Sequence, residues 1–164
     1  MFSGDICAVS ADRLYRVRIQ ANVITAIVEH ANHARNNETG GILIGYIDET
    51  GGAVITEATG KPQGSAFGRF SFIRRTRGLS LLLKKRWLES QHYLGEWHTH
   101  PGGEPDPSPV DRQSMRLIAL SGNYYCPEPI LLILGIRRGQ SAISLTVFPH
   151  NREDVSLIGE ACVG

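Results

Sequence analysis

Two histidines that are two positions apart and followed by a proline constrain this chain more than any other feature: His98, His100 and Pro101. Side chains alternate between the two faces of a β-strand, so both imidazoles point the same way if residues 93–100 form a strand. Pro101 then ends the strand, because proline has no N–H to donate to a neighbouring strand. The sequence thus predicts two imidazoles side by side at the end of a strand.

A helix start follows the two histidines. Residues 102–107 are rich in glycine and proline, which predicts a loop. Ser108 then suits the N-cap of a helix and Pro109 its first turn. Asp111 falls in that first turn, which we expect to face back toward the strand end. Two neutral imidazoles and one carboxylate are ligands of a catalytic zinc ion, whose fourth position stays open to water.

A purely structural interpretation of the same residues has to be weighed. Ser-x-x-Asp before an apolar run is also a capping box, and most such matches are only that. Two histidines also share a strand face by chance. The joint pattern favours zinc, and the two interpretations are compatible, because a capped helix start is a rigid mount for Asp111.

The combination of His-x-His-Pro with Ser-x-x-Asp resembles the JAMM motif of the JAB/MPN metalloproteases. That family also has a glutamate upstream, which Glu38 matches at the start of the glycine-rich stretch 38–45. The resemblance spans about residues 17–148. It is strongest to the short, single-domain bacterial members, one group of which belongs to CBASS anti-phage operons beside ubiquitin-activation-like enzymes.

The resemblance implies a role for each matched residue. Zinc held by His98, His100 and Asp111 would lower the pKa of its water from 15.7 toward ~7. Glu38 would take the proton and deliver it to the leaving amine. Ser108 would donate a hydrogen bond to the developing oxyanion.

A second glutamate, Glu96, competes with Glu38 for the role of base. Glu96 is two residues before His98 and therefore shares the face of the histidines. We favour a supporting or solvent-facing role for it, since Glu38 matches the family pattern and Glu96 does not.

The remaining periodicity predicts one α/β (α+β) domain over residues 1–164. Alternating residues predict a half-buried strand over 14–20, and the apolar run 130–136 predicts a central strand buried on both faces. Residues 151–164 carry no strong signal. By resemblance, the fold is a single JAB/MPN-type domain with a curved mixed sheet flanked by helices. The further strands are expected at 40–47, 53–59 and 141–148, and the helices at 21–35, 79–91 and 110–120.

Composition excludes several classes of function. The net charge of +1 argues against a general nucleic-acid binder, and no apolar run reaches the ~18 residues of a membrane span. The first residues lack the design of a signal peptide. The three cysteines, Cys7, Cys126 and Cys162, are odd in number and have no Cys-x-x-Cys spacing. This predicts free thiols in a reduced cytoplasm rather than a disulfide.

Three classes of function remain. The first is a zinc isopeptidase or peptidase that cleaves the amide bond after the C-terminal residue of a ubiquitin-like modifier or conjugated protein. A CBASS nucleotidyltransferase is one candidate conjugate, and a carrier-protein or small peptide conjugate is the alternative substrate. The second class is a non-catalytic scaffold, against which the complete residue set speaks. The third, a nucleobase deaminase, needs His-x-Glu and Pro-Cys-x-x-Cys, and the surroundings of Cys126 do not match.

Two stretches could contact a substrate. The basic stretch 69–86 is either a solvated face or a grip on an acidic partner, and the body of a modifier is expected to rest on residues 61–95. Gly40 and Gly41 predict a bulge or a close backbone approach in their strand. These glycines either leave room for a substrate main chain, which would pair with an edge strand there, or reflect simple backbone geometry.

Overall fold

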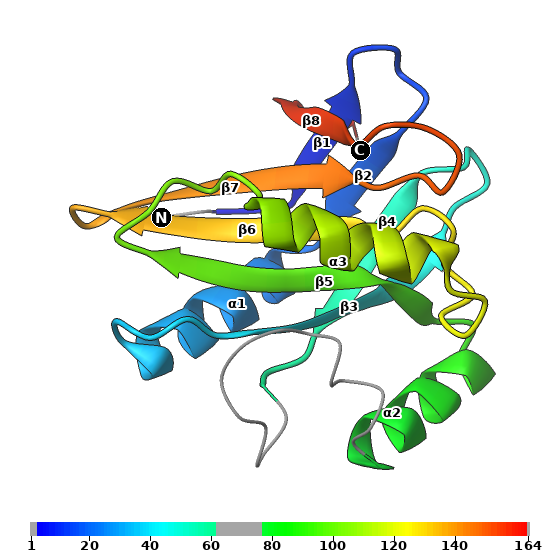
Figure 1. Ribbon diagram of the computed structural model, residues 1–164, viewed down its shortest axis with the longest axis horizontal. Helices are drawn as coiled ribbons and strands as arrows, with labels where there is room; N and C mark the ends of the chain where they lie inside the picture. Colours follow the sequence, from blue (N-terminus) through cyan, green and yellow to red (C-terminus); the bar gives the residue numbers. More distant parts are fainter. Residues whose placement is uncertain (1–2, 62–76, 164) are drawn as a thin grey trace.

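The computed structural model describes residues 3–61 and 77–163, which form eight strands and three helices (Figure 1). The predicted strands and helices of the sequence are all present, with ends that differ by a few residues. In chain order the elements are β1 (Ile6–Ser10), β2 (Arg16–Ile19), α1 (Ala21–Ala34), β3 (Gly40–Ile47), β4 (Ala53–Ala58), α2 (Arg77–Leu88), β5 (His92–Pro101), α3 (Pro109–Leu120), β6 (Ile130–Arg137), β7 (Gln140–Val147) and β8 (Val155–Glu160).

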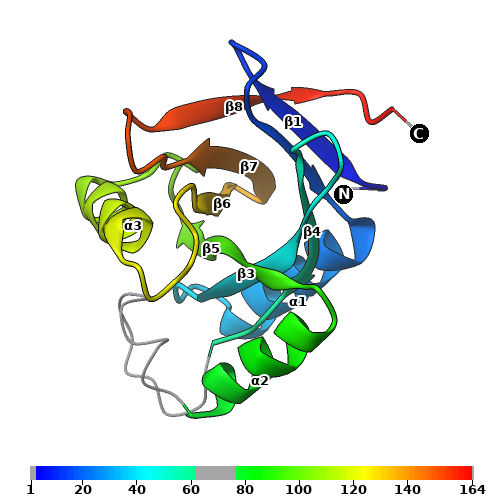
Figure 2. The same cartoon turned by 90° about the vertical axis from the view of Figure 1, so that its right-hand side faces the viewer.

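The strands form a closed barrel in the order β1-β2-β4-β3-β5-β6-β7-β8, seen nearly end-on in Figure 2. Two neighbouring pairs, β2 with β4 and β5 with β6, are parallel, and the other pairs are antiparallel. The sheet is therefore mixed, as expected, and its curvature continues to full closure. This confirms the α/β fold class.

Strand β6 separates two apolar clusters, because its alternate side chains face opposite ways. Leu132 and Leu134 belong to the first cluster, to which α1 contributes its apolar face. Leu131 and Ile133 belong to the second, which is covered by side chains of α2 and α3. Both faces of β6 are buried, so the prediction of a central strand over its apolar run is confirmed.

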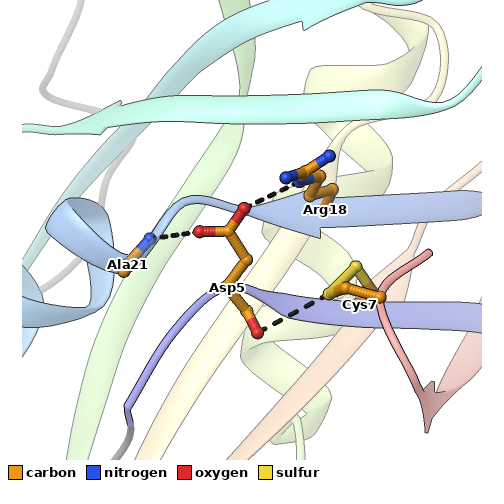
Figure 3. Close-up of a disulfide and its surroundings, with 5 residues drawn as sticks. Asp5, Cys7, Arg18 and Ala21 are labelled. Carbon is orange, nitrogen blue, oxygen red and sulfur yellow. Dashed lines mark hydrogen bonds and ion pairs between the residues drawn. A yellow bond between two sulfur atoms is a disulfide. The ribbon is translucent and has the colours of Figure 1, made fainter. Parts of the chain in front are cut away.

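The end strands β1 and β8 were not predicted, and with them a disulfide was missed. Cys7 and Cys162 are bonded across 155 positions of sequence, so the expectation of free thiols is wrong for these two residues. Strand β1 pairs with β8, and Cys7 lies opposite Glu160, two residues before Cys162. Only this pairing of the two chain ends brings the sulfurs together. Figure 3 shows the bond.

A carboxylate beside the disulfide ties the first strands to α1. Asp5 accepts hydrogen bonds from the Arg18 guanidinium at 2.7 Å and from the Ala21 backbone N–H at 2.9 Å (Figure 3). The second bond satisfies one of the free N–H groups at the start of a helix that has no N-cap side-chain bond of its own. Asp5, just before β1, therefore links β2 to the start of α1.

Gly41 makes room for the protein's own backbone. A Cβ atom at this position would lie 1.9 Å from the Thr59 carbonyl oxygen, far inside contact distance. Strand β3 is also hydrogen-bonded to β4 on one side and to β5 on the other. The close-approach prediction is confirmed for the chain itself, and the expected edge strand for a substrate is wrong for the described residues.

The basic stretch is described only from residue 77 onward, so Arg69, Arg74 and Arg75 lie outside the described residues. On α2, Lys84 and Lys85 are exposed. No helix within residues 3–61 and 77–163 has the length and apolar character needed to cross a membrane.

Thiol titration will test the cysteine assignment. Burial raises the pKa of the Cys126 thiol to about 12, so at pH 8 this thiol is both neutral and shielded. We expect no reactive thiol in the folded protein, one after unfolding without reductant, and three after unfolding with reductant. Three thiols without reductant would show that the Cys7–Cys162 bond does not form.

Candidate metal centre

The two histidines of the motif lie at the end of β5, where backbone pairing holds them from both sides. His98 is opposite Gly40 of β3 and beside Ile133 of β6, and the pairing with β6 continues past His100. The two Nε2 atoms are 3.1 Å apart. His98 is buried and His100 is partly exposed. As predicted, alternation along the strand turns both imidazoles to one face.

The third group, Asp111, comes from the first turn of α3. Ser108 caps the helix: its hydroxyl accepts a hydrogen bond from the Asp111 N–H at 3.1 Å, and its own N–H donates to Asp111 Oδ2 at 2.8 Å. Asp111 Oδ1 lies 3.5 Å from His98 Nε2, and Oδ2 lies 3.7 Å from His100 Nε2. The capping box and the metal site are therefore built from the same residues.

These three side chains fit a metal ion. One donor atom from each lies within 4.8 Å of the others, and the separations between neighbouring donors are 3.1, 3.5 and 3.7 Å. Donors about 2.0–2.1 Å from a tetrahedral zinc are about 3.3 Å apart, so the spacing matches. His100 Nδ1 is 2.9 Å from the Glu104 carbonyl, which accepts a hydrogen bond from Nδ1–H. The other ring nitrogen, Nε2, is then free to bind a metal.

The charge on Asp111 also suits a ligand. Partial burial by itself would raise the pKa of Asp111, but the hydrogen bond and charge of His98 and the bonds from Ser108 outweigh it. Together they hold the pKa of Asp111 well below its usual range. The carboxylate is therefore ionised at neutral pH, as metal binding requires.

The other two predicted site residues, Glu38 and Ser108, adjoin the elements that carry this cluster. Glu38 immediately precedes Thr39, whose carbonyl accepts a bond from the Thr99 N–H at 2.9 Å. Continuing the register of β3 and β5 by two residues places Glu38 opposite His100, on the histidine face. Its side chain is exposed. Ser108 accepts its capping bond through oxygen, and its hydroxyl hydrogen remains able to donate.

Glu96 is completely enclosed, which excludes the solvent-facing alternative. It is 1% exposed, and its carboxylate accepts a hydrogen bond from the Tyr93 hydroxyl at 3.3 Å. Burial raises the pKa of Glu96 to about 8; the bond from Tyr93 opposes this, and the charge of Asp111 adds to it. A supporting role behind the histidines is the remaining alternative to a role as base.

The orienting carbonyl of Glu104 was not predicted from the sequence. Backbone oxygens carry no residue-type signal, and the glycine–proline loop predicted only that the chain turns there. The Glu104 side chain also forms an ion pair, at 2.5 Å, with Arg137 at the end of β6. The loop that follows the histidines is thus held at its middle.

Comparison with known proteins gives one family. Residues 20–146 match the family model described as prokaryotic homologs of the JAB domain. A CD-NTase/cGAS isopeptidase of Enterobacter hormaechei subsp. hoffmannii is 42% identical over 155 residues, which cover 93% of this chain and 86% of that protein. A probable metalloprotease of Sinorhizobium fredii is 29% identical over 71% of this chain and 73% of its own length. A solved protein of Desulfitobacterium hafniense shares the fold, with a TM-score of 0.62, 18% identity and 92% of each chain covered.

Removing one histidine tests the ligand set. We expect the purified protein to contain one metal ion per chain and the His100→Ala variant to lose it, because two donors remain where three are needed. Elemental analysis after gel filtration measures the metal. A variant that keeps one ion per chain would falsify the assignment, and unchanged far-UV circular dichroism serves as the folding control.

Proposed function

The chain belongs to the family of prokaryotic JAB-domain homologues and is a hydrolytic metalloenzyme, and on that premise we propose that it is a zinc-dependent isopeptidase. The single observation that carries this proposal is the convergence of His98, His100 and Asp111 beside a capped helix start. Two imidazoles and a carboxylate leave the fourth zinc position to water, which is the arrangement of catalytic rather than structural zinc.

The residues divide the chemistry of amide hydrolysis between them. Zinc bound here would lower the pKa of a water molecule and polarise the scissile carbonyl. Glu38, opposite His100, accepts the proton of the attacking water and donates it to the leaving nitrogen. The Ser108 hydroxyl donates to the carbonyl oxygen as that oxygen gains charge. The Glu104 carbonyl keeps His100 in the tautomer that presents Nε2.

The substrate class follows from the named relatives. Three of them, at 42%, 32% and 30% identity, are CD-NTase/cGAS isopeptidases. By analogy, the substrate of this chain is a protein conjugate in which a ubiquitin-like modifier is joined through its C-terminal residue, with a CD-NTase as the conjugated protein. The reaction would then remove modifiers during CBASS anti-phage defence. By the same analogy the reaction takes place in the cytoplasm, where a disulfide such as Cys7–Cys162 would be exceptional.

The surface around α2 is suited to the folded body of the modifier. Lys84 and Lys85 are exposed there, and Trp87 is 61% exposed. Arg86 is paired with Glu57 at 2.5 Å and with Glu89 at 3.0 Å, whereas Lys84 and Lys85 add exposed positive charge to this surface. A cavity of about 380 Å³ lies against the side of α2 that carries Leu79, Leu83 and Trp87, and is lined mainly by apolar and aromatic side chains of α2, the start of β5 and residues 123–125. Exposed aromatic residues next to basic ones are typical of protein contacts.

Exchange of each glutamate will separate the base from its competitor. We expect Glu38→Gln to keep the metal and the melting temperature while kcat falls about 10²–10⁴-fold, the usual contribution of a general base. Glu96→Gln should keep most activity, because glutamine still accepts the bond from Tyr93. Steady-state kinetics with metal analysis on each variant measures this. An inactive Glu96→Gln beside an active Glu38→Gln would show that the wrong glutamate was chosen.

A fused substrate will test the reaction itself. We expect the enzyme to release a reporter joined by an amide bond to the C-terminal residue of a ubiquitin-like modifier, and chelation to abolish the release. Mass spectrometry locates the bond that is cut.

Lys84→Glu with Lys85→Glu should raise KM and leave kcat nearly unchanged, whereas Arg13→Glu, an exposed control in the turn between β1 and β2, should change neither. Cleavage only of short peptides would favour the small-conjugate alternative.

A further inference from the structure

Helix α3 is anchored unevenly. Its buried residues, Met115, Ile118 and Ala119, all lie in its second half, and Met115 and Ile118 join the second apolar cluster. The first half, which carries Asp111, has no buried residue. Apolar packing therefore fixes the far end of the helix more firmly than the end that faces the metal site, and the first turn needs another tie to the barrel.

That tie is an ion pair with Asp154, in the loop between β7 and β8. Arg112 and Arg116, four residues apart and so on one side of the helix, both bind Asp154. Arg116 Nη2 lies 3.0 Å from Asp154 Oδ1, and Arg112 bonds the other carboxylate oxygen. The Asp154 side chain is 18% exposed, so water screens this cluster less than an open surface pair.

Asp154 belongs to a segment that is itself fixed. The Phe148 N–H donates to the Pro129 carbonyl at 2.9 Å, and the His150 N–H donates to the Pro127 carbonyl at 2.8 Å. Arg152 then binds Asp12 at 3.1 Å in the turn between β1 and β2. Strand β8 begins directly after Asp154 and pairs with β7 and β1. The carboxylate is therefore presented from a rigid base.

We propose that Asp154 is a positioning residue for the metal centre. It holds Arg112, the residue next to Asp111, and thereby fixes where the first turn of α3 presents its carboxylate. It also keeps the Arg112 guanidinium directed away from Asp111, where a free guanidinium would compete with a cation for the carboxylate. The inference rests on the proposed function, because it takes His98, His100 and Asp111 as the ligands.

Metal affinity will test this without measuring hydrolysis. Metal-free protein is titrated with zinc against a chelating indicator, and with cobalt(II), whose visible absorption reports ligand geometry. We expect Asp154→Asn to raise the zinc dissociation constant by up to about 10-fold, the lower end of the effect of losing a group bonded directly to a ligand, because Asp154 acts through Arg112; the cobalt spectrum should change as well. Asp154→Glu should recover part of the affinity.

A matched control separates positioning from general stability. Arg152→Gln removes an arginine–aspartate pair from the same segment without touching α3, and its arginine is 41% exposed against 42% for Arg112. We expect this variant to keep normal zinc affinity and the normal cobalt spectrum, because the pair that it removes is exposed and the backbone bonds of Phe148 and His150 still hold the segment. Equal affinities in the two variants would overturn the inference.

Removal of the arginine provides a second approach, which remains usable if Asp154→Asn does not fold. Arg112→Gln should weaken zinc binding to a similar degree, and combining it with Asp154→Asn should add little, since both changes break one link. Full additivity, or normal affinity in Arg112→Gln, would contradict the proposal.

If the wild-type protein binds zinc and cleaves its substrate while these variants bind zinc equally well, the inference fails and the proposed function stands. If the wild-type protein binds no zinc, both fail.

Discussion

Strand β5 is paired with antiparallel β3 from His92 to His98 and with parallel β6 from Gly95 to Pro101, and this pairing determines where the proposed metal ligands lie. Residues on a strand alternate between faces, so a shift of one residue in either ladder would turn His98 and His100 into the first apolar cluster. The alternating apolar residues of β6 resist such a shift, because it would exchange the two buried faces. The packing that folds the barrel therefore also aims the imidazoles.

At the start of α3, the same atoms serve both the helix cap and the proposed metal site. The bond from the Ser108 N–H to Asp111 Oδ2 satisfies the helix start and at the same time fixes the carboxylate. Asp111 Oδ1 is left directed at His98. Because these local bonds form within four residues, this part of the site is largely preformed before a metal binds, which lowers the entropy lost on binding.

Local patterns explain what could be predicted from the sequence. Strand β3, strand β5 and the cap of α3 each carry their signal within a few residues, as alternation, an apolar run or a Ser-Pro start. Strands β1 and β8 carry weaker signals, because they are short and partly exposed and each depends on a partner about 150 residues away. The Cys7–Cys162 bond was missed for the same reason. The burial of Glu96 was left open, because strand alternation predicts the face of a side chain and not what covers it; in the structure the Tyr93 hydroxyl bonds Glu96 across an irregularity in the β3–β5 register.

Strands β1 and β8, which local patterns did not predict, support the motif residues, which local patterns did predict. The closure of the barrel by β1 and β8 completes the sheet, and it also holds the segment that ends in Asp154. The ligands of the motif lie within fourteen residues of sequence, whereas the support of the helix that carries Asp111 comes from more than forty residues further on. On the proposal made for Asp154, a chain that kept the motif but lost its last strand would keep the ligand types and lose part of their support. The barrel closure would then contribute to the proposed metal site.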